Sequence, residues 1–172
     1  MANLKDSPHF AVNNNYYTPK SAWNKIKDLI PTNAVIWESC MLNSISMSPS
    51  YLQELLPTCR IEHNTTMDML TDSIECDMII TNPPFETALK KQILKRLVEL
   101  NKPFLIVMNI MNCSANYFTE ILDKNHLQII IINGKINYDK LEEDKVIPTK
   151  NCSFYSCFVA YKMNLRNDQL FV

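Results

Sequence analysis

The sequence predicts an α/β fold, in which helices cover both faces of a mostly parallel sheet. Short apolar segments typical of buried strands alternate with amphipathic or N-capped segments typical of helices along most of the chain. This alternation favours strand–helix–strand units, which place their strands in parallel and their helices on the faces of the sheet. With 172 residues, the chain is long enough to bury a core of its own, so one domain is expected.

The start of the chain predicts a lead-in followed by a helix. Residues 1–15 are polar and rich in asparagine, and we expect them to be a flexible or irregular lead-in. A helix is predicted over residues 20–30, with Thr18 as its N-cap and Pro19 as its first residue. The single domain is therefore expected to span residues 16–172.

The remaining elements follow from apolar runs and periodicity. Strands are predicted at residues 34–38, 59–62, 77–81, 104–109, 127–132 and 152–162. Helices are predicted at residues 48–56, 86–100 and 114–124, of which 86–100 has the most regular apolar stripe. Residues 134–149 carry neither pattern, and an irregular insertion is expected there.

Composition excludes several classes of protein. The net charge of −1 gives no overall basic surface of the kind that free-standing nucleic-acid binders carry. No apolar run is long enough to cross a bilayer, and the first residues lack a signal-peptide core, so no membrane partner and an intracellular, cytoplasmic or nuclear location are expected. The six cysteines include no C-x-x-C pair and are expected to be reduced, and the three histidines have no metal-ligand spacing, so no metal is expected.

The strand at residues 77–81 ends in the most informative motif of the chain, Asn82-Pro83-Pro84-Phe85. The two prolines predict a rigid turn, and open α/β sheets place their sites at the carboxyl ends of strands. The Asn82 side-chain oxygen and the Pro83 carbonyl can accept hydrogen bonds from a planar amino group, on which the Phe85 ring can stack. The alternative is a rigid strand-to-helix turn with Phe85 in the core.

These four residues resemble the catalytic motif of the S-adenosylmethionine-dependent amino-methyltransferases, which methylate adenine N6 or, in a sister branch, a glutamine side-chain amide. The resemblance implies a Rossmann-like class I methyltransferase fold, S-adenosylmethionine as the cofactor, and the four motif residues as the catalytic site. It covers nearly the whole chain in order, although the Asn-Pro-Pro-Phe motif is its one specific element.

The resemblance also implies a set of cofactor-binding residues: Tyr17, Thr18, Glu38, Glu62 and Asp68. Tyr17 and Thr18 match a segment over the methionine end of the cofactor, although Thr18 is equally explained as a helix cap. Glu38 matches the acid of the first cofactor motif, Glu62 matches the acid that binds ribose, and Asp68 matches the acid at the adenine amino group. Charged residues are also common after strands, so a surface role for Glu62 remains open.

The chain departs from the family in that first cofactor motif. Where the family has acid-Pro-x-x-Gly-x-Gly, this chain has Leu42 and Ser44 in place of the two glycines, and its one glycine is Gly134. Glycine usually stands where the backbone passes close to a cofactor. A catalytically inactive methyltransferase-like subunit that binds a partner or nucleic acid is therefore one alternative function.

The resemblance implies methylation of adenine in nucleic acid, with DNA as the first expectation and RNA as the second. The glutamine branch is the other alternative. Because no separate recognition domain is expected, a partner subunit or the segment at 134–150 would have to find the target.

Four basic side chains after the motif are interpreted as a solvated face that could also run beside a phosphate backbone: Lys90, Lys91, Lys95 and Arg96. An aromatic in residues 151–158 could help to hold the target base, but a half-buried strand is the preferred interpretation. The single glycine and the many Asn, Ile and Lys residues indicate an AT-biased genome, such as that of a virus or a reduced microbe.

Overall fold

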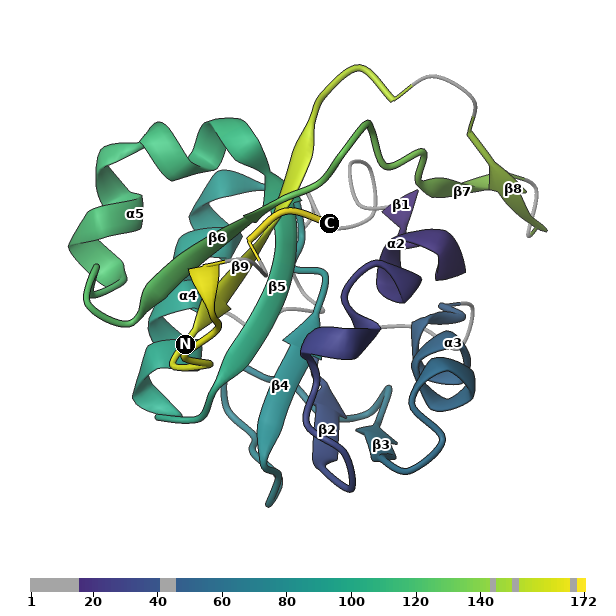
Figure 1. The fold of residues 1–172 in the computed structure, drawn as a ribbon, viewed down its shortest axis with the longest axis horizontal. Helices are drawn as coiled ribbons and strands as arrows, with labels where there is room; N and C mark the ends of the chain where they lie inside the picture. Colours follow the sequence, from purple (N-terminus) through teal and green to yellow (C-terminus); the bar gives the residue numbers. More distant parts are fainter. Residues whose placement is uncertain (1–15, 41–45, 143–144, 150–151, 168–169) are drawn as a thin grey trace.

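The computed structural model describes residues 16–40, 46–142, 145–149, 152–167 and 170–172, and the expected lead-in at 1–15 lies outside them. A six-stranded sheet in the order β3-β2-β4-β5-β9-β6 forms the centre of the molecule (Figure 1). Its strands are β2 (Val35–Glu38), β3 (Arg60–His63), β4 (Met78–Thr81), β5 (Phe104–Asn109), β6 (Leu127–Ile131) and β9 (Ser156–Tyr161). The pairs β2–β3, β2–β4 and β4–β5 are parallel, whereas β9 lies antiparallel between β5 and β6. The prediction of a mostly parallel sheet is confirmed.

Helices cover both faces of this sheet, as predicted. The helical elements are α2 (Lys20–Asn24), η2 (Lys27–Leu29), α3 (Ser48–Leu55), α4 (Thr87–Glu99), η3 (Ile110–Ser114) and α5 (Asn116–Ile121). In Figure 1, α4 and α5 lie on one side of the sheet, and α2 and α3 lie on the other. Each pair encloses its own apolar cluster: the first core contains Trp23 and Leu52, and the second core contains Leu94 and Phe118.

The central strands supply both cores because their side chains alternate between the two faces. In β4, for example, Ile80 belongs to the first core and Ile79 to the second, and both are fully buried. Strands buried on both faces are mostly apolar, which is why they form nearly continuous apolar runs in the sequence.

A second, three-stranded sheet lies beside the main one and was not predicted. It consists of β1 (Tyr16–Tyr17), β7 (Asp139–Glu142) and β8 (Lys145–Pro148), all antiparallel. The prediction that residues 134–149 form an irregular insertion is therefore wrong. Pairing between Tyr16 and Lys140 joins segments too far apart in the sequence for a local pattern to reveal.

Four other element predictions need correction. The helix predicted at 20–30 ends at Asn24 and continues as the short helix η2, because its amides bond three residues back, as from Ile26 N to Trp23 O. Pro19 is the N-cap residue, and Thr18 makes no capping hydrogen bond. The helix predicted at 114–124 is α5 alone, and the strand predicted at 152–162 begins at Ser156.

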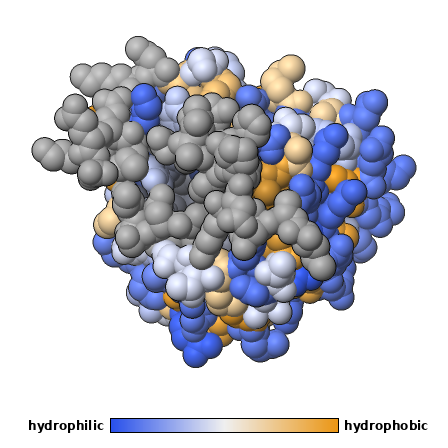
Figure 2. Space-filling model, turned by 180° about the vertical axis from the view of Figure 1, so that it is seen from behind, coloured by the Kyte–Doolittle hydropathy of each residue, from blue (hydrophilic) through white to orange (hydrophobic). Residues whose placement is uncertain are grey.

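The surface is mixed in character. Figure 2 shows the face opposite to Figure 1, where hydrophilic residues surround small hydrophobic areas outside the grey atoms. Among the helices of the described ranges, none has both the length and the apolar character that crossing a bilayer requires.

Candidate active site

The candidate site lies where β2 and β4 end, side by side, at the carboxyl edge of the sheet. Glu38 is the last residue of β2, and Thr81 is the last residue of β4. The Thr81 hydroxyl donates a hydrogen bond to Oε1 of Glu38 (2.6 Å) and accepts one from the amide of Cys40 (3.0 Å). This buried hydroxyl therefore joins the segment after β2, the predicted cofactor side, to the strand that carries the Asn-Pro-Pro-Phe turn.

In that turn, the side chain of Asn82 is held by its amino group. Its Nδ2 donates a long hydrogen bond of 3.4 Å to the main-chain carbonyl of Tyr16. A carbonyl can accept but cannot donate, so this contact sets which end of the amide faces Tyr16. The Oδ1 atom is buried and has no hydrogen-bond partner in the described part of the chain. The two prolines that follow, Pro83 and Pro84, are both buried.

Three of the site residues predicted from the sequence have a buried polar atom without a hydrogen-bond partner. Within the described ranges, the buried side-chain oxygen and nitrogen atoms without a partner are Thr18 Oγ1, Glu38 Oε2 and Asn82 Oδ1. An unpaired buried polar atom costs about 1–3 kcal/mol, and folded proteins leave few of them. Each of these oxygens can accept a hydrogen bond.

Glu38 is a carboxyl group of this site whose pKa is strongly raised. Its residue is 4% exposed, and this burial raises its pKa from the ordinary value of 4.5 to about 7. Hydrogen bonds from Thr81 and from the Cys40 amide oppose the rise because they stabilise the charged form. A ligand that donates a hydrogen bond to Oε2 would favour the carboxylate further.

Four aromatic side chains gather at the turn: Tyr16, Phe85, Tyr138 and Phe154. The Phe85 ring centroid lies 5.9 Å from that of Tyr16, 5.8 Å from that of Tyr138 and 5.5 Å from that of Phe154, in edge-to-face contacts. Phe85 thus takes part in a cluster that joins the main sheet to the small one. Both the stacking role and the packing role considered for Phe85 are compatible with its partly buried position.

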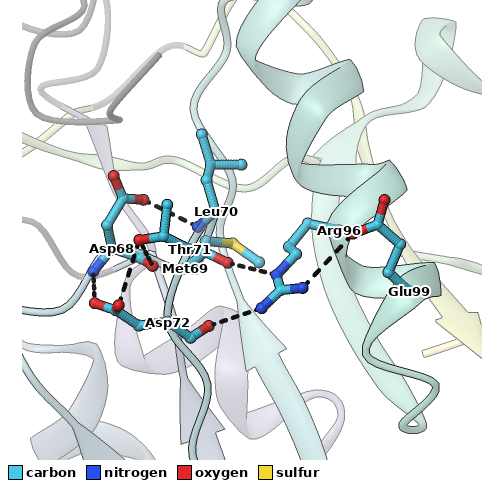
Figure 3. A network of polar contacts seen from close by, with 7 residues as sticks. All are labelled: Asp68, Met69, Leu70, Thr71, Asp72, Arg96 and Glu99. Atoms are coloured by element: carbon cyan, nitrogen blue, oxygen red, sulfur yellow. Dashed lines mark hydrogen bonds and ion pairs between the residues drawn. The ribbon is translucent and has the colours of Figure 1, made fainter. Parts of the chain in front are cut away.

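The predicted cofactor residue Asp68 organises a turn (Figure 3). Its Oδ1 accepts a hydrogen bond from the Leu70 amide (2.9 Å), and its own amide donates to Oδ2 of Asp72 (2.8 Å). Arg96 of α4 reaches the same turn, donating to the carbonyls of Met69 and Asp72, each at 3.3 Å. The sulfur of Met69 contacts the thiol of Cys40 at 3.4 Å, so the Asp68 turn packs on the segment after Glu38.

Glu62 and Tyr17 lie at the two sides of the site. Glu62 is on the edge strand β3, where it forms an ion pair with Arg60 (2.8 Å) and its side chain is 40% exposed. A hollow of about 410 Å³ opens at the end of this strand, lined by residues that include Met47 and His63. Tyr17 is in β1, paired with Asp139 and adjacent to the unpaired Thr18. The replaced glycine positions, Leu42 and Ser44, lie outside the described residues.

The interpretation of the basic residues after the motif as a solvated face is wrong for Lys90. Lys90 is 3% exposed, and its ammonium group donates to the carbonyl of Phe85 and to Oδ1 of Asn112, both at 3.1 Å. Arg96 binds the Asp68 turn while 23% of its side chain stays exposed, and Lys91 lies over the ring of Tyr117. Of the four, Lys95 is exposed.

The contacts of Thr81 and Lys90 at the site were not predicted from the sequence, although each residue leaves a signal there. Thr81 is a polar residue at the end of an apolar strand, directly before the motif. Lys90 precedes Ile93, Leu94 and Leu97 by three, four and seven residues, which places it on the buried stripe of α4. No cluster of three or more potential metal ligands occurs within the described ranges.

No protein-family model matches the sequence, and no curated protein matches it. Three methyltransferases are among the solved structures with a similar course of the chain. They include a precorrin-6y C5,15-methyltransferase from Geobacter metallireducens GS-15 (11% identity, 91% of this chain and 100% of that chain, TM-score 0.45). A TehB-like SAM-dependent methyltransferase from Corynebacterium glutamicum is 12% identical over 80% of this chain and 84% of that chain, with a TM-score of 0.34. A SAM-dependent O-methyltransferase from Thermotoga maritima is 11% identical over 86% of this chain and 66% of that chain, with a TM-score of 0.40.

Proposed function

We propose that the chain is an S-adenosylmethionine-dependent methyltransferase that acts on the exocyclic N6 amino group of adenine in nucleic acid, with DNA favoured over RNA. The observation that carries this proposal is the orientation of Asn82. Its Nδ2 is bound to the Tyr16 carbonyl, which leaves Oδ1 buried and without a hydrogen-bond partner in the described part of the chain. An amino group on a planar ring is a donor of the kind that this oxygen lacks.

The other two unpaired oxygens fit the cofactor. The amino group and the ribose hydroxyls of S-adenosylmethionine are hydrogen-bond donors, which Thr18 Oγ1 and Glu38 Oε2 could accept. Tyr17 beside Thr18, the buried Asp68 turn and Glu62 at the end of β3 would complete the binding side. S-adenosylmethionine supplies an activated methyl group, and transfer yields a methylated nitrogen, S-adenosylhomocysteine and one proton, which passes to solvent.

The motif residues would then act on the amino group. The adenine N6 lone pair is delocalised into the ring, so the free amine is a poor nucleophile. Acceptance of its hydrogens by Asn82 Oδ1 and by the Pro83 carbonyl would draw the nitrogen toward tetrahedral geometry and stabilise the positive charge that develops on it. The two buried prolines keep these acceptors rigid, which reduces the cost of alignment.

Target adenine must leave a duplex to reach such a turn, or it must already be unpaired. The ring of Phe85, in contact with Tyr138 and Phe154, would provide an aromatic surface for the base. Net charge is −1, so tight non-specific attraction to phosphates is not expected. This supports a role for a partner subunit in finding the target.

The test is transfer of a labelled methyl group from S-adenosylmethionine to DNA, RNA and protein pools. Wild type should label nucleic acid at adenine N6, and Asn82→Ala should lower the rate by about 100-fold or more because one preorganised acceptor is lost. Gln92→Ala, an exposed amide on α4, is the matched control and should keep the wild-type rate.

Three outcomes would contradict the proposal. Equal labelling of nucleic acid by Asn82→Ala would remove the role of Asn82. Label in a glutamine amide instead of adenine would support the protein-methylating alternative. Absence of both binding heat and a thermal shift with millimolar S-adenosylmethionine would support the inactive-subunit alternative.

A further inference from the structure

Lys90 is a buried lysine that the proposed chemistry does not use. It is the fourth residue of α4 and faces the sheet side of the helix, with 3% of its surface exposed. Lysine is almost never buried to this extent unless its ammonium group is paired. Its location on the buried stripe of α4 would suit leucine or methionine without any cost of burying a charge.

The ammonium group joins two segments that follow neighbouring parallel strands. One hydrogen bond goes to the main-chain carbonyl of Phe85, the last residue of the turn after β4. The other goes to Oδ1 of Asn112 in η3, the segment directly after β5. Both bonds are 3.1 Å long, and the strands β4 and β5 pair directly.

Asn112 is itself held firmly, so it can serve as an anchor. Its Nδ2 donates to the carbonyl of Asn109 at 2.8 Å, and its Oδ1 also accepts from the hydroxyl of Tyr117 at 2.7 Å. The segment η3 is further fixed by the bond from the Ile110 amide to the Tyr155 carbonyl at 3.0 Å. Through Lys90, this rigid segment holds the carbonyl end of the Asn-Pro-Pro-Phe turn.

Glu86, the N-cap residue of α4, is engaged in capping the helix. Its carboxylate accepts hydrogen bonds from the amides of Ala88 and Leu89 at 2.8 Å and 2.6 Å. Burial lowers the pKa of Lys90, and the negative charge of Glu86 partly offsets this effect. The lysine thus remains in place through hydrogen bonds to neutral acceptors in addition to this charge.

Burial of an ammonium group costs several kcal/mol before its hydrogen bonds are counted, and an apolar residue at the same position is often as stable or more stable. Stability alone therefore does not explain a lysine here. We propose that Lys90 is a positioning residue, which holds the Asn82–Phe85 turn against η3 so that the turn meets an incoming amino group in a fixed geometry. This inference rests on the proposed function for its effect on methyl transfer, but the bracing itself does not.

The experiment compares Lys90→Met with Lys95→Met. Methionine matches the apolar stripe and fills the space of the lysine stem, so the variant is expected to fold, whereas Lys95 is the exposed control on the same helix. Lys90→Met should lower kcat by about 10- to 100-fold because small misplacements of catalytic groups have effects of that size. The Kd for S-adenosylmethionine should change less than about twofold, because Lys90 touches the turn and not the predicted cofactor residues. Lys90→Arg should restore part of kcat because it restores a charged donor.

Hydrogen exchange provides a second measurement that needs no turnover. In Lys90→Met, peptides that cover residues 85–89 and 110–115 should exchange about tenfold faster, with no such change in Lys95→Met. Unchanged exchange in both peptides, or a wild-type kcat in Lys90→Met, would overturn the inference. If wild type transfers no methyl group at all, the proposed function fails while the exchange measurement still decides whether Lys90 braces the turn.

Discussion

At the scale of single residues, Glu38 combines burial with a carboxyl group that titrates near neutral pH. Its Oε1 is bound to the Thr81 hydroxyl, whereas its Oε2 is buried without a partner in the described part of the chain. Burial raises its pKa to about 7, well above that of an unfolded glutamate. Between about pH 4.5 and pH 7, the folded protein therefore keeps a proton on Glu38 that the unfolded chain releases.

This difference in protonation predicts the pH dependence of stability. Below about pH 4.5, both states are protonated, and Glu38 has no effect through ionisation. As pH rises from 4.5 to about 7, only the unfolded state ionises freely, so the free energy of unfolding falls by up to roughly 3 kcal/mol from this one group. Glu38→Gln keeps an acceptor for Thr81 and cannot ionise. We expect it to match wild type at pH 4 and to exceed it by up to that amount at pH 8, as measured by urea unfolding.

The matched control is Glu120→Gln, an exposed glutamate on α5, which should leave the pH dependence of the free energy of unfolding as it is in wild type. Parallel curves for wild type and Glu38→Gln across pH 4–8 would contradict the assigned titration. Added S-adenosylmethionine should reduce the advantage of Glu38→Gln at pH 8, because a donor to Oε2 stabilises the carboxylate of wild type.

At the scale of elements, α4 connects both halves of the candidate site. Near its start, Lys90 holds the turn after β4, and nearly two helical turns later Arg96 holds the turn around Asp68 (Figure 3). The Arg96 guanidinium donates to the carbonyls of Met69 and Asp72, a fork that the single ammonium group of lysine cannot reproduce. The helix α4 therefore orients both the turn after β4 and the turn around Asp68.

Arg96→Lys is therefore expected to lower the free energy of unfolding by about 1–2 kcal/mol, since two hydrogen bonds from a charged group are lost or weakened. Hydrogen exchange should rise in the loop at residues 66–74, and the Kd for S-adenosylmethionine should increase because Asp68 loses its support. Lys95→Met, at an exposed position of the same helix, is the control and should change none of these three quantities. A loop that exchanges at the wild-type rate in Arg96→Lys would show that the turn is held by Asp68 and Asp72 alone.

Local sequence patterns predict the elements whose neighbours are close in the sequence or whose burial is complete. The strand predicted at 104–109 coincides with β5, and the helix predicted at 86–100 extends one residue beyond α4 at each end. A fully buried strand and a long amphipathic helix each have a clear pattern of apolar residues. The pairing of Tyr16 with Lys140 could not be predicted, because a two-residue strand has no pattern of its own. Similarly, the motif indicated Asn82, but only the folded chain shows that Tyr16 orients its amide.

At the scale of the whole molecule, the six-stranded sheet separates two apolar cores, and the two tryptophans of the chain lie on opposite sides of it. Trp23 is in the first core, where its indole N–H donates to the Ser48 hydroxyl at 3.1 Å. Trp37 is in the second core and is 2% exposed. Because β4, β5 and β9 contribute alternate side chains to both cores, neither core can lose its packing while the other keeps a complete sheet.

We therefore predict one cooperative unfolding transition, which each tryptophan reports equally. Leu94→Ala in the second core should lower the free energy of unfolding by about 2–5 kcal/mol. In a Trp37→Phe background, where Trp23 reports on the first core, and in a Trp23→Phe background, where Trp37 reports on the second, the mutation should shift the urea midpoint by the same amount. Leu52→Ala is the matched change in the first core and should shift both midpoints in the same way. If Leu94→Ala moved the midpoint reported by Trp37 and left that of Trp23 in place, the two cores would unfold separately, and the shared strands would not couple the two sides of the candidate site.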